Sequence, residues 1–97
     1  MIEDLPCSIV MGFTLGPITP SPGVIQKIPE SEVLLAIQRH AFQDWGDVCE
    51  EDRFANDEAL KESNRLLSVY HSSEGEEFWV ITEWNRSATT VLLPEEY

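Results

Sequence analysis

The chain carries apolar residues at helical spacing in its middle third and at alternating spacing in its last third. The first set of helical positions comprises Val33, Leu34, Ile37 and Ala41. This period predicts a helix over about residues 31–42, with Ser31 as its N-cap because a serine hydroxyl can accept a bond from a free amide of the first turn. Arg39 and His40 fall in the last turn, where positive charge suits the helix dipole.

A second helix is predicted over about residues 48–63. Asp47 followed by Glu50 has the form of a capping box, and Asn64 suits the end of a helix because it tolerates a left-handed backbone. The apolar positions of this helix form a thin stripe of Val48, Phe54 or Ala55, Ala59 and Leu60. Its other faces are acidic.

The last third alternates in the manner of strands, over about residues 66–70, 78–82 and 89–93. The short loops between these strands predict an antiparallel meander. In the middle strand, Phe78, Val80 and Thr82 would lie on one face of the sheet, and Trp79, Ile81 and Glu83 on the other. Both faces carry apolar residues, so we expect the N-terminal segment or a partner subunit to cover the second.

Residues 1–30 are rich in Pro and Gly and are predicted to be an irregular segment with a short strand at 9–13 and a turn at 19–23. Ninety-seven residues supply one hydrophobic core, which predicts a single domain over 1–97, with a helical part at 31–63 and a β-meander at 64–97. Helices followed by a meander favour an α+β fold, with two helices packed on a three- to four-stranded antiparallel sheet.

The charge of the chain is strongly negative, because 18 acidic residues face 6 basic ones and give −12 at pH 7. Such a chain repels nucleic acid, so direct nucleic-acid binding is not expected, and it is attracted to basic surfaces on other proteins. There is no long apolar run, and the acidic N-terminus is unlike a secretory signal, so we expect a cytoplasmic protein without a membrane partner. Cys7 and Cys49 match neither a disulfide framework nor a metal-site spacing.

Several motifs between residues 19 and 97 form a recognisable series. They are Arg39-His40, Asp44-Trp45-Gly46-Asp47, Asp52, Asn56, residues 66–70 and 79–83, Arg86-Ser87, Thr90 and residues 92–97. This series resembles a family of small bacterial proteins found on plasmids and other mobile elements, which has no established function. The resemblance implies an accessory protein of a mobile element. Gln43 and Asn85 depart from the pattern, where Gly and Asp are expected; if that Asp takes part in chemistry, this chain lacks the chemistry.

The residues with the most enzyme-like chemistry are His40, Asn56, Tyr70, Arg86 and Thr89 or Thr90. Metal-independent RNA cleavage needs a base, a cation and a hydrogen-bond donor for the phosphate. A small ribonuclease-like enzyme or toxin using His40, Arg86 and Thr90 is therefore one hypothesis. The structural alternative is that His40 caps the first helix, Arg86 lies in a turn and the threonines are ordinary strand residues. The negative charge of the chain also disfavours a nuclease.

Asp44, Asp47, Asp52 and Asn56 form a second polar group around the predicted second helix. Carboxylate and amide oxygens can bind Mg²⁺ or Ca²⁺, but this spacing does not match the alternating ligands of an EF-hand loop. The chain also lacks a glycine-rich phosphate loop. We therefore predict no metal and no cofactor.

The region from Asp44 to Glu62 holds eight acidic residues among nineteen and only two bases. A helix covered with carboxylates can imitate a nucleic-acid backbone and bind a basic protein, for example a host-defence nuclease. The predicted binding residues are Glu50, Glu51, Asp57, Glu58 and Trp84. Trp45 and Trp79 are predicted core residues. A further alternative is a structural or regulatory homodimer with Trp79 or Trp84 at a two-fold interface.

Overall fold

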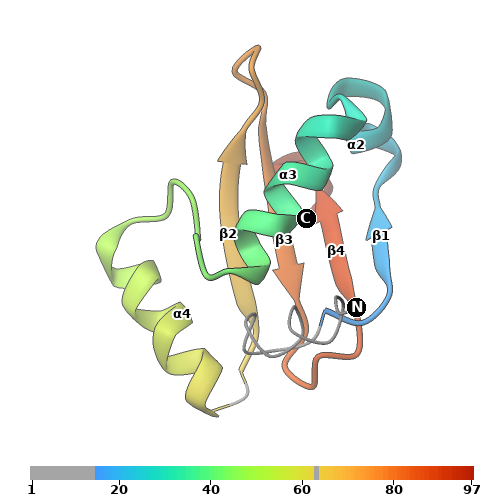
Figure 1. Ribbon diagram of the computed structural model, residues 1–97. Helices are drawn as coiled ribbons and strands as arrows, with labels where there is room; N and C mark the ends of the chain where they lie inside the picture. Colours follow the sequence, from blue (N-terminus) through green and yellow to red (C-terminus); the bar gives the residue numbers. More distant parts are fainter. Residues whose placement is uncertain (1–14, 63) are drawn as a thin grey trace, which may run out of the picture.

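The computed structural model describes residues 15–62 and 64–97 of the chain (Figure 1). In order, the elements are β1 (Ile18–Pro20), α2 (Pro22–Lys27), α3 (Glu30–Ala41), α4 (Glu50–Glu62), β2 (Leu66–His71), β3 (Glu77–Thr82), β4 (Thr89–Leu92) and the short 3-10 helix η1 (Pro94–Glu96). The four strands form one sheet in the order β1-β4-β3-β2. The pairs β2–β3 and β3–β4 are antiparallel, as predicted, and the fold is α+β.

The segment before α3 is more regular than the sequence indicated. Strand β1 pairs in parallel with β4, with Ile18 opposite Thr89, so the sheet is mixed and not purely antiparallel. The turn predicted at 19–23 is wrong, because α2 begins at Pro22 and adds a third helix. Ser21 caps α2 by accepting a bond from the Val24 amide at 3.2 Å, and proline suits the first helical position because it has no amide hydrogen. The strand predicted at 9–13 lies outside the described residues.

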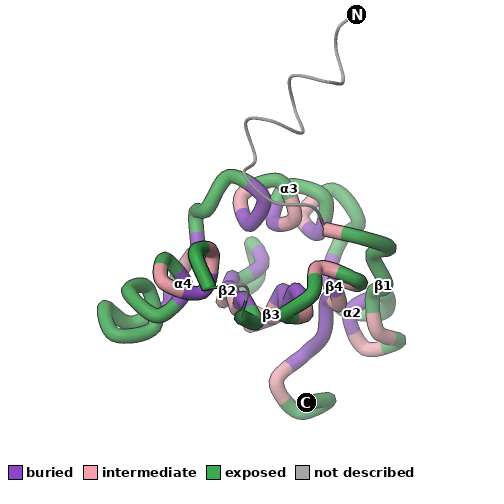
Figure 2. The backbone as a smooth tube through the Cα atoms, turned by 90° about the horizontal axis from the view of Figure 1, so that it is seen from below, coloured by how far each residue is buried: buried purple, intermediate pink, exposed green. Residues whose placement is uncertain are grey.

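Helix α3 lies over one face of the sheet (Figures 1 and 2). Its N-cap is Pro29, so the assignment of Ser31 as the cap is wrong. The side chains that it buries are Val33, Ala36, His40 and Ala41. Leu34 is 54% exposed, so its assignment to the buried stripe is also wrong. The buried stripe includes His40, so it does not coincide with the apolar stripe that the sequence predicted.

The main core lies between α2, α3 and the sheet. It comprises Val24, Ile28, Val33, Ala36, Tyr70, Phe78, Val80, Val91 and Leu93. Phe78, Val80 and Thr82 are buried on this face, as the alternation predicted. On the other face, Trp79 packs edge-on against the terminal Tyr97 with ring centroids 5.5 Å apart. The N-terminal segment or a partner subunit was expected to cover that face, and residues 1–14 of this segment lie outside the described residues.

The connection from α3 to α4 runs along the outer edge of β2. Val69 donates its amide hydrogen to the Trp45 carbonyl at 3.1 Å and accepts from the Asp47 amide at 2.7 Å. Gly46 has a φ of 78°, and a Cβ at this position would lie 2.0 Å from the Val69 oxygen, so only glycine permits the approach. The opposite edge is β1, which ends at Pro20 and is preceded by Pro17. The β2 edge is thus covered by the α3–α4 connection, whereas prolines limit hydrogen bonding at the β1 edge.

Helix α4 begins at Glu50, two residues later than predicted. Asp47 does not form the predicted capping box, because its carboxylate lies 2.8 Å from Nδ1 of His71. Phe54 and Ala55 are exposed, which corrects their assignment to the apolar stripe. The helix instead buries Asn56 and Ala59. Its buried side is too narrow to produce a clear apolar period.

Candidate functional site

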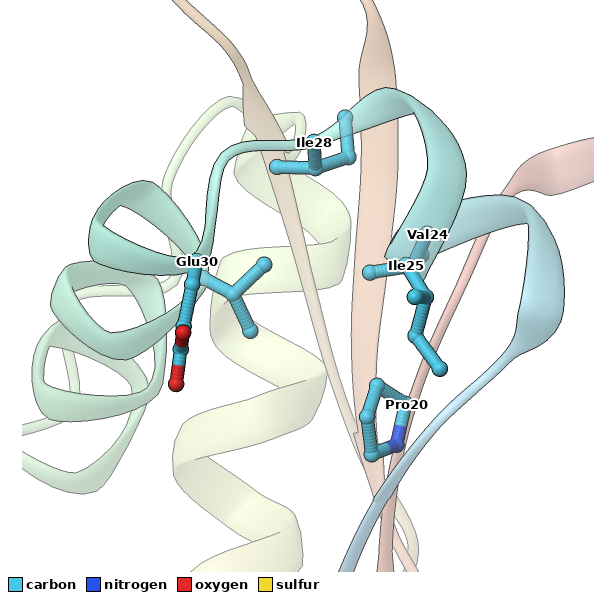
Figure 3. A pocket seen from close by; sticks show the side chains of 6 residues that line it. Pro20, Val24, Ile25, Ile28 and Glu30 are labelled. Atoms are coloured by element: carbon cyan, nitrogen blue, oxygen red, sulfur yellow. The ribbon is translucent and has the colours of Figure 1, made fainter.

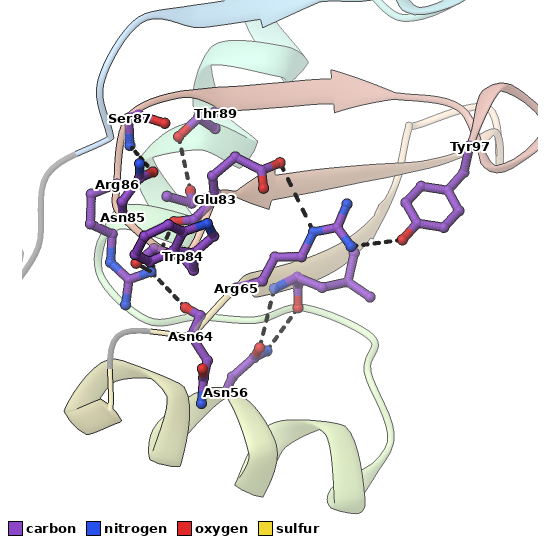
Figure 4. Close-up of polar contacts among 12 residues, drawn as sticks. Asn56, Asn64, Arg65, Glu83, Trp84, Asn85, Arg86, Ser87, Thr89 and Tyr97 are labelled. Carbon is purple, nitrogen blue, oxygen red and sulfur yellow. Dashed lines mark hydrogen bonds and ion pairs between the residues drawn. The ribbon is translucent and has the colours of Figure 1, made fainter.

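Helix α4 stands at the edge of the sheet, outside the layer formed by α3 and the strands (Figures 1 and 2). Ala59 belongs to a second core cluster with Trp45, Val48 and Leu66, and Leu60 packs against this cluster. Asn56 pairs with the main chain of β2 (Figure 4). The outward side of α4 is exposed along its length (Figure 2). It is therefore available to a partner.

The outward side of α4 carries the acidic residues that the sequence indicated as a binding surface. Glu50, Glu51 and Asp57 are exposed and Glu58 is half-buried. Local partners compensate little of this charge, since the contacts of Arg53 with Glu50 and of Lys61 with Glu58 are long, at 3.8 and 3.7 Å, and exposed. Asp57 also accepts a bond from the indole nitrogen of Trp45 at 3.2 Å. That contact joins the acidic surface to the core.

Phe54 is the residue of this surface that the sequence analysis missed. Its side chain is 66% exposed. It lies three or four residues from each of the four predicted binding acids, so on a helix all four are its neighbours. The spacing was visible in the sequence: an aromatic residue surrounded by acids at these intervals belongs to a solvent-facing side. The surface thus combines one aromatic ring with four carboxylates, and we call it the Phe54 surface.

His40, the predicted catalytic base, is fully buried between α3 and the sheet. Its Nδ1 lies 2.6 Å from the Ser68 hydroxyl and its Nε2 lies 2.9 Å from the Thr82 hydroxyl. Burial, together with the nearby charge of Arg86, lowers the pKa of His40 from 6.5 to about 4. A neutral imidazole therefore holds α3 to β2 and β3.

The polar contacts of His40 continue through the threonines. Thr82 and Thr89 have hydroxyl oxygens 2.9 Å apart, and Thr89 donates to the carbonyl of Leu15 at 2.6 Å. Thr90 alternates to the opposite face of the sheet and is not part of this network. Among the described residues, no buried side-chain nitrogen or oxygen lacks a partner. The network is therefore a satisfied part of the core.

Arg86 binds main-chain carbonyl groups around the end of α4 (Figure 4). Its Nη1 donates to the carbonyl oxygens of Asn64 at 2.6 Å and Glu83 at 3.1 Å, and its Nη2 donates to that of Ala59 at 3.2 Å. Its own backbone is left-handed, with a φ of 60°. Carbonyls at a helix C-terminus attract cations, so Arg86 ties the β3–β4 connection to the last turn of α4.

The other residues of the enzyme hypothesis also have structural partners. Tyr70 is 1% exposed and donates its hydroxyl hydrogen to the Asp44 carbonyl at 2.6 Å, and burial raises its pKa. The buried Asn56 pairs with β2. The structure thus brings His40 and Thr89 together inside the core. It provides no solvent-accessible acid–base pair within this set.

Three of the four groups considered for a metal, Asp44, Asp47 and Asn56, have separate partners. Asp44 accepts from Arg39 at 2.8 Å, and this bond holds the pKa of the Asp44 carboxyl below its usual value. Asp47 contacts His71, and Asn56 contacts β2. Within residues 15–62 and 64–97, no cluster of three or more His, Cys, Asp or Glu side chains could hold a metal ion.

The three tryptophans occupy different environments. Trp45 is 2% exposed, which confirms it as a core residue. Trp79 is only half-buried, on the sheet face opposite α3, so its assignment to the core is wrong. Trp84 is 61% exposed in the β3–β4 connection, next to the Arg86 contacts (Figure 4). It lies apart from the Phe54 surface in sequence and in secondary structure.

Comparison with known proteins supplies no relative for this fold. The chain matches no family model, no curated protein and no solved structure. None of the helices in the described part of the chain is long and apolar enough to cross a membrane. The resemblance to mobile-element proteins remains a prediction.

Proposed function

We propose that the protein is a non-catalytic binding protein whose Phe54 surface contacts a basic partner protein. The observation that carries the proposal is the position of Phe54, a ring that is 66% exposed on the outward side of α4 and has four acids as helical neighbours. An exposed aromatic residue inside a charged surface is the composition of a contact anchor with a polar rim.

The two chemical components would act at different stages of binding. The carboxylates attract a positively charged protein over a distance, which accelerates encounter and selects against acidic partners. The ring of Phe54 then enters an apolar pocket and loses its contact with water, which stabilises the complex. This is how a helix binds in a groove, with one apolar anchor and charged residues beside it.

The finer proposal is that α4 imitates a nucleic-acid backbone. Glu50 and Asp57 lie seven residues apart, as do Glu51 and Glu58, which places each pair about 10 Å apart along the helix axis. Two rows of carboxylates on a rigid rod suit a groove whose lysine and arginine side chains otherwise bind phosphates. With the resemblance to mobile-element proteins, this supports a host-defence nuclease as the partner.

The ribonuclease hypothesis has less support from the geometry. Its base, His40, is fully buried and its predicted donor, Thr90, lies on the opposite face of the sheet. Arg86 directs four hydrogen bonds to carbonyl groups of the chain itself. These positions favour stabilising roles for the three residues.

The test is capture of basic proteins from a bacterial lysate at low and moderate salt. One variant removes the four charges of the Phe54 surface (Glu50→Gln, Glu51→Gln, Asp57→Asn, Glu58→Gln). A matched variant removes four charges elsewhere (Glu30→Gln, Glu74→Gln, Glu76→Gln, Glu95→Gln). We expect the native chain and the matched variant to retain one salt-sensitive basic partner and the first variant to lose it. Equal loss in both variants would reduce the effect to net charge and overturn the proposal.

A further inference from the structure

The outward face of α3 is uncharged, which is unusual in a chain of net charge −12. Its exposed residues are Ser31, Leu34, Leu35, Gln38 and, just after the helix, Phe42. Leu34, Leu35 and Phe42 are 54, 57 and 54% exposed. These positions recur every three or four residues and form one stripe opposite the buried side. We call this stripe the α3 ridge.

The α3 ridge has a hollow on each side. Towards β1, a mainly apolar groove of about 280 Å³ is lined by Pro20, Val24, Ile25, Ile28, Glu30 and Val33 (Figure 3). Ile25 is 67% exposed at this groove. Towards the β2–β3 hairpin, a groove of about 220 Å³ is mixed, and is lined by Leu35, Ala36, Tyr70 and Phe78 together with Glu32, Arg39, His71 and Ser73. The ridge and the groove towards β1 form an exposed apolar surface of the kind that marks a protein interface.

We infer that the α3 ridge is the interface between two copies of this chain. The acidic surfaces of the molecule make two copies repel each other, and the repulsion is weakest where the surface carries no charge. Charges adjoin the ridge only on its flanks, at Glu30 on one side and at Glu32 and Arg39 on the other. A basic partner would find no carboxylate on the ridge itself, whereas a second copy presents the same uncharged surface.

The charges on the flank of the α3 ridge have partners within the chain, where Glu32 accepts hydrogen bonds from Ser73 and Arg39 donates to Asp44. Their spacing along the helix also suits a second copy. A two-fold axis beside Leu35 makes the two α3 helices antiparallel and brings the exposed leucines of both copies together. Glu32 and Arg39 are equally distant from that axis along the helix and lie on the same flank. Glu32 of one copy then lies level with Arg39 of the other, twice in the interface. The antiparallel helix dipoles also favour this arrangement.

Dimerisation through the α3 ridge is independent of the proposed function. Helix α4 lies at the β2 edge, away from the outward side of α3 (Figure 2). A dimer built on the ridge would leave the Phe54 surface of each copy exposed. It also differs from the sequence-based alternative, which placed Trp79 or Trp84 at the two-fold axis.

The test is sedimentation equilibrium of the full-length chain from low to high micromolar concentration. We expect the native protein to be a dimer, and the double variant Leu34→Glu, Leu35→Glu to be a monomer with the same far-UV circular dichroism. The control Phe54→Ser removes an apolar side chain outside the ridge that is 66% exposed, and this variant should remain a dimer. The milder variant Leu35→Ser should raise the dimer Kd by roughly tenfold or more, and it decides the result if the double variant does not fold.

Two outcomes would overturn the α3 interface. A native chain that sediments as a monomer at every concentration has no such interface. A dimer that persists in both ridge variants, or that dissociates on Phe54→Ser, uses another surface. Neither outcome changes the result expected in the lysate experiment. That experiment depends on the four acids of α4 and measures the capture of a basic protein.

Discussion

The side-chain amide of Asn56 takes the place of a neighbouring strand for Leu67. Its Nδ2 donates to the Leu67 carbonyl at 2.7 Å, and the Leu67 amide donates to its Oδ1 at 3.1 Å. Strand β2 is the last strand of the sheet, so these main-chain groups have no strand beside them. One side chain thus satisfies a donor and an acceptor and fixes α4 to the sheet.

Replacing Asn56 by alanine should lower the free energy of unfolding by about 2–4 kcal/mol, because it leaves two main-chain groups without partners in a partly buried position. Urea unfolding followed by tryptophan fluorescence measures this. Lys61→Ala on the same helix removes only an exposed ion pair and should change stability by less than about 0.5 kcal/mol. Equal effects of the two substitutions would mean that the amide pairing does not contribute.

Alanine substitutions at two glycines with positive φ distinguish the cost of backbone strain from the cost of a steric clash. Gly46 and Gly75 have φ angles of 78° and 89°. An added Cβ would lie 2.0 Å from the Val69 oxygen at Gly46 and within 4 Å of nothing at Gly75. We expect Gly75→Ala to cost about 1 kcal/mol and Gly46→Ala more than about 3 kcal/mol in thermal unfolding. A similar cost at both positions would show that β2 does not need the close approach.

The buried His40 should make the protein sensitive to mild acid. Above pH 6.5 the imidazole is neutral in the folded and unfolded states, so it adds no pH dependence. As the pH falls from 6.5 towards 4, the unfolded chain binds a proton that the folded chain excludes. Stability is therefore lost across this window, by on the order of 3 kcal/mol for a pKa lowered to about 4.

Urea unfolding at several pH values between 7.5 and 4.5 tests the role of His40. We expect His40→Gln to be less stable at neutral pH, because the buried contacts to Ser68 and Thr82 change, but to lose much of the slope in this window. A slope that survives in the His40 variant would assign the acid sensitivity to other groups.

The planar guanidinium group of Arg86, and not only its positive charge, should be required for stability. Lysine cannot reach the carbonyls of Ala59, Glu83 and Asn64 with one ammonium group, so Arg86→Lys should cost about 1–3 kcal/mol. Arg53→Lys is the control, since Arg53 makes only an exposed ion pair. Hydrogen exchange should show faster opening of the last turn of α4 in the Arg86 variant only.

The strands of the second half could be predicted because each has one buried and one less buried face. The burial of Phe78, Trp79 and Val80 alternates between the two sides of the sheet, and Ile81 is buried as well although it lies on the same side as Trp79. The predicted and observed bounds of α3 agree within one residue, because the residues on both sides of the helix interrupt the helical pattern. Local pattern was sufficient where burial follows a regular period.

The remaining fold depends on contacts that a local pattern does not record. Strand β1 is three exposed residues long, and only its pairing with β4 defines it. His40 is buried because Ser68 and Thr82 come from distant strands to satisfy it, so a polar residue replaced an apolar one in the core stripe. Leu34 is exposed to solvent, although leucine is usually buried.

The sequence predicted an acidic face on the second helix, and three of its four named acids are exposed, because the eight acidic residues from Asp44 to Glu62 have only two bases among them. The aromatic centre of this face was not predicted, since Phe54 was taken as part of an apolar stripe. The stripe of α4 is actually formed by Ala59 and the amide of Asn56. A polar side chain that pairs with main chain leaves no hydrophobic signal, and this hid the orientation of the helix.

The treatment of both sheet edges restricts how this protein can self-associate or be recognised. Prolines at positions 17 and 20 and the chain beside Val69 leave little open ladder for an incoming strand. Fibril growth by strand addition therefore lacks a template at either end of the sheet. Recognition then uses surface side chains instead of strand addition, so its specificity can change by surface substitutions while the backbone framework stays the same.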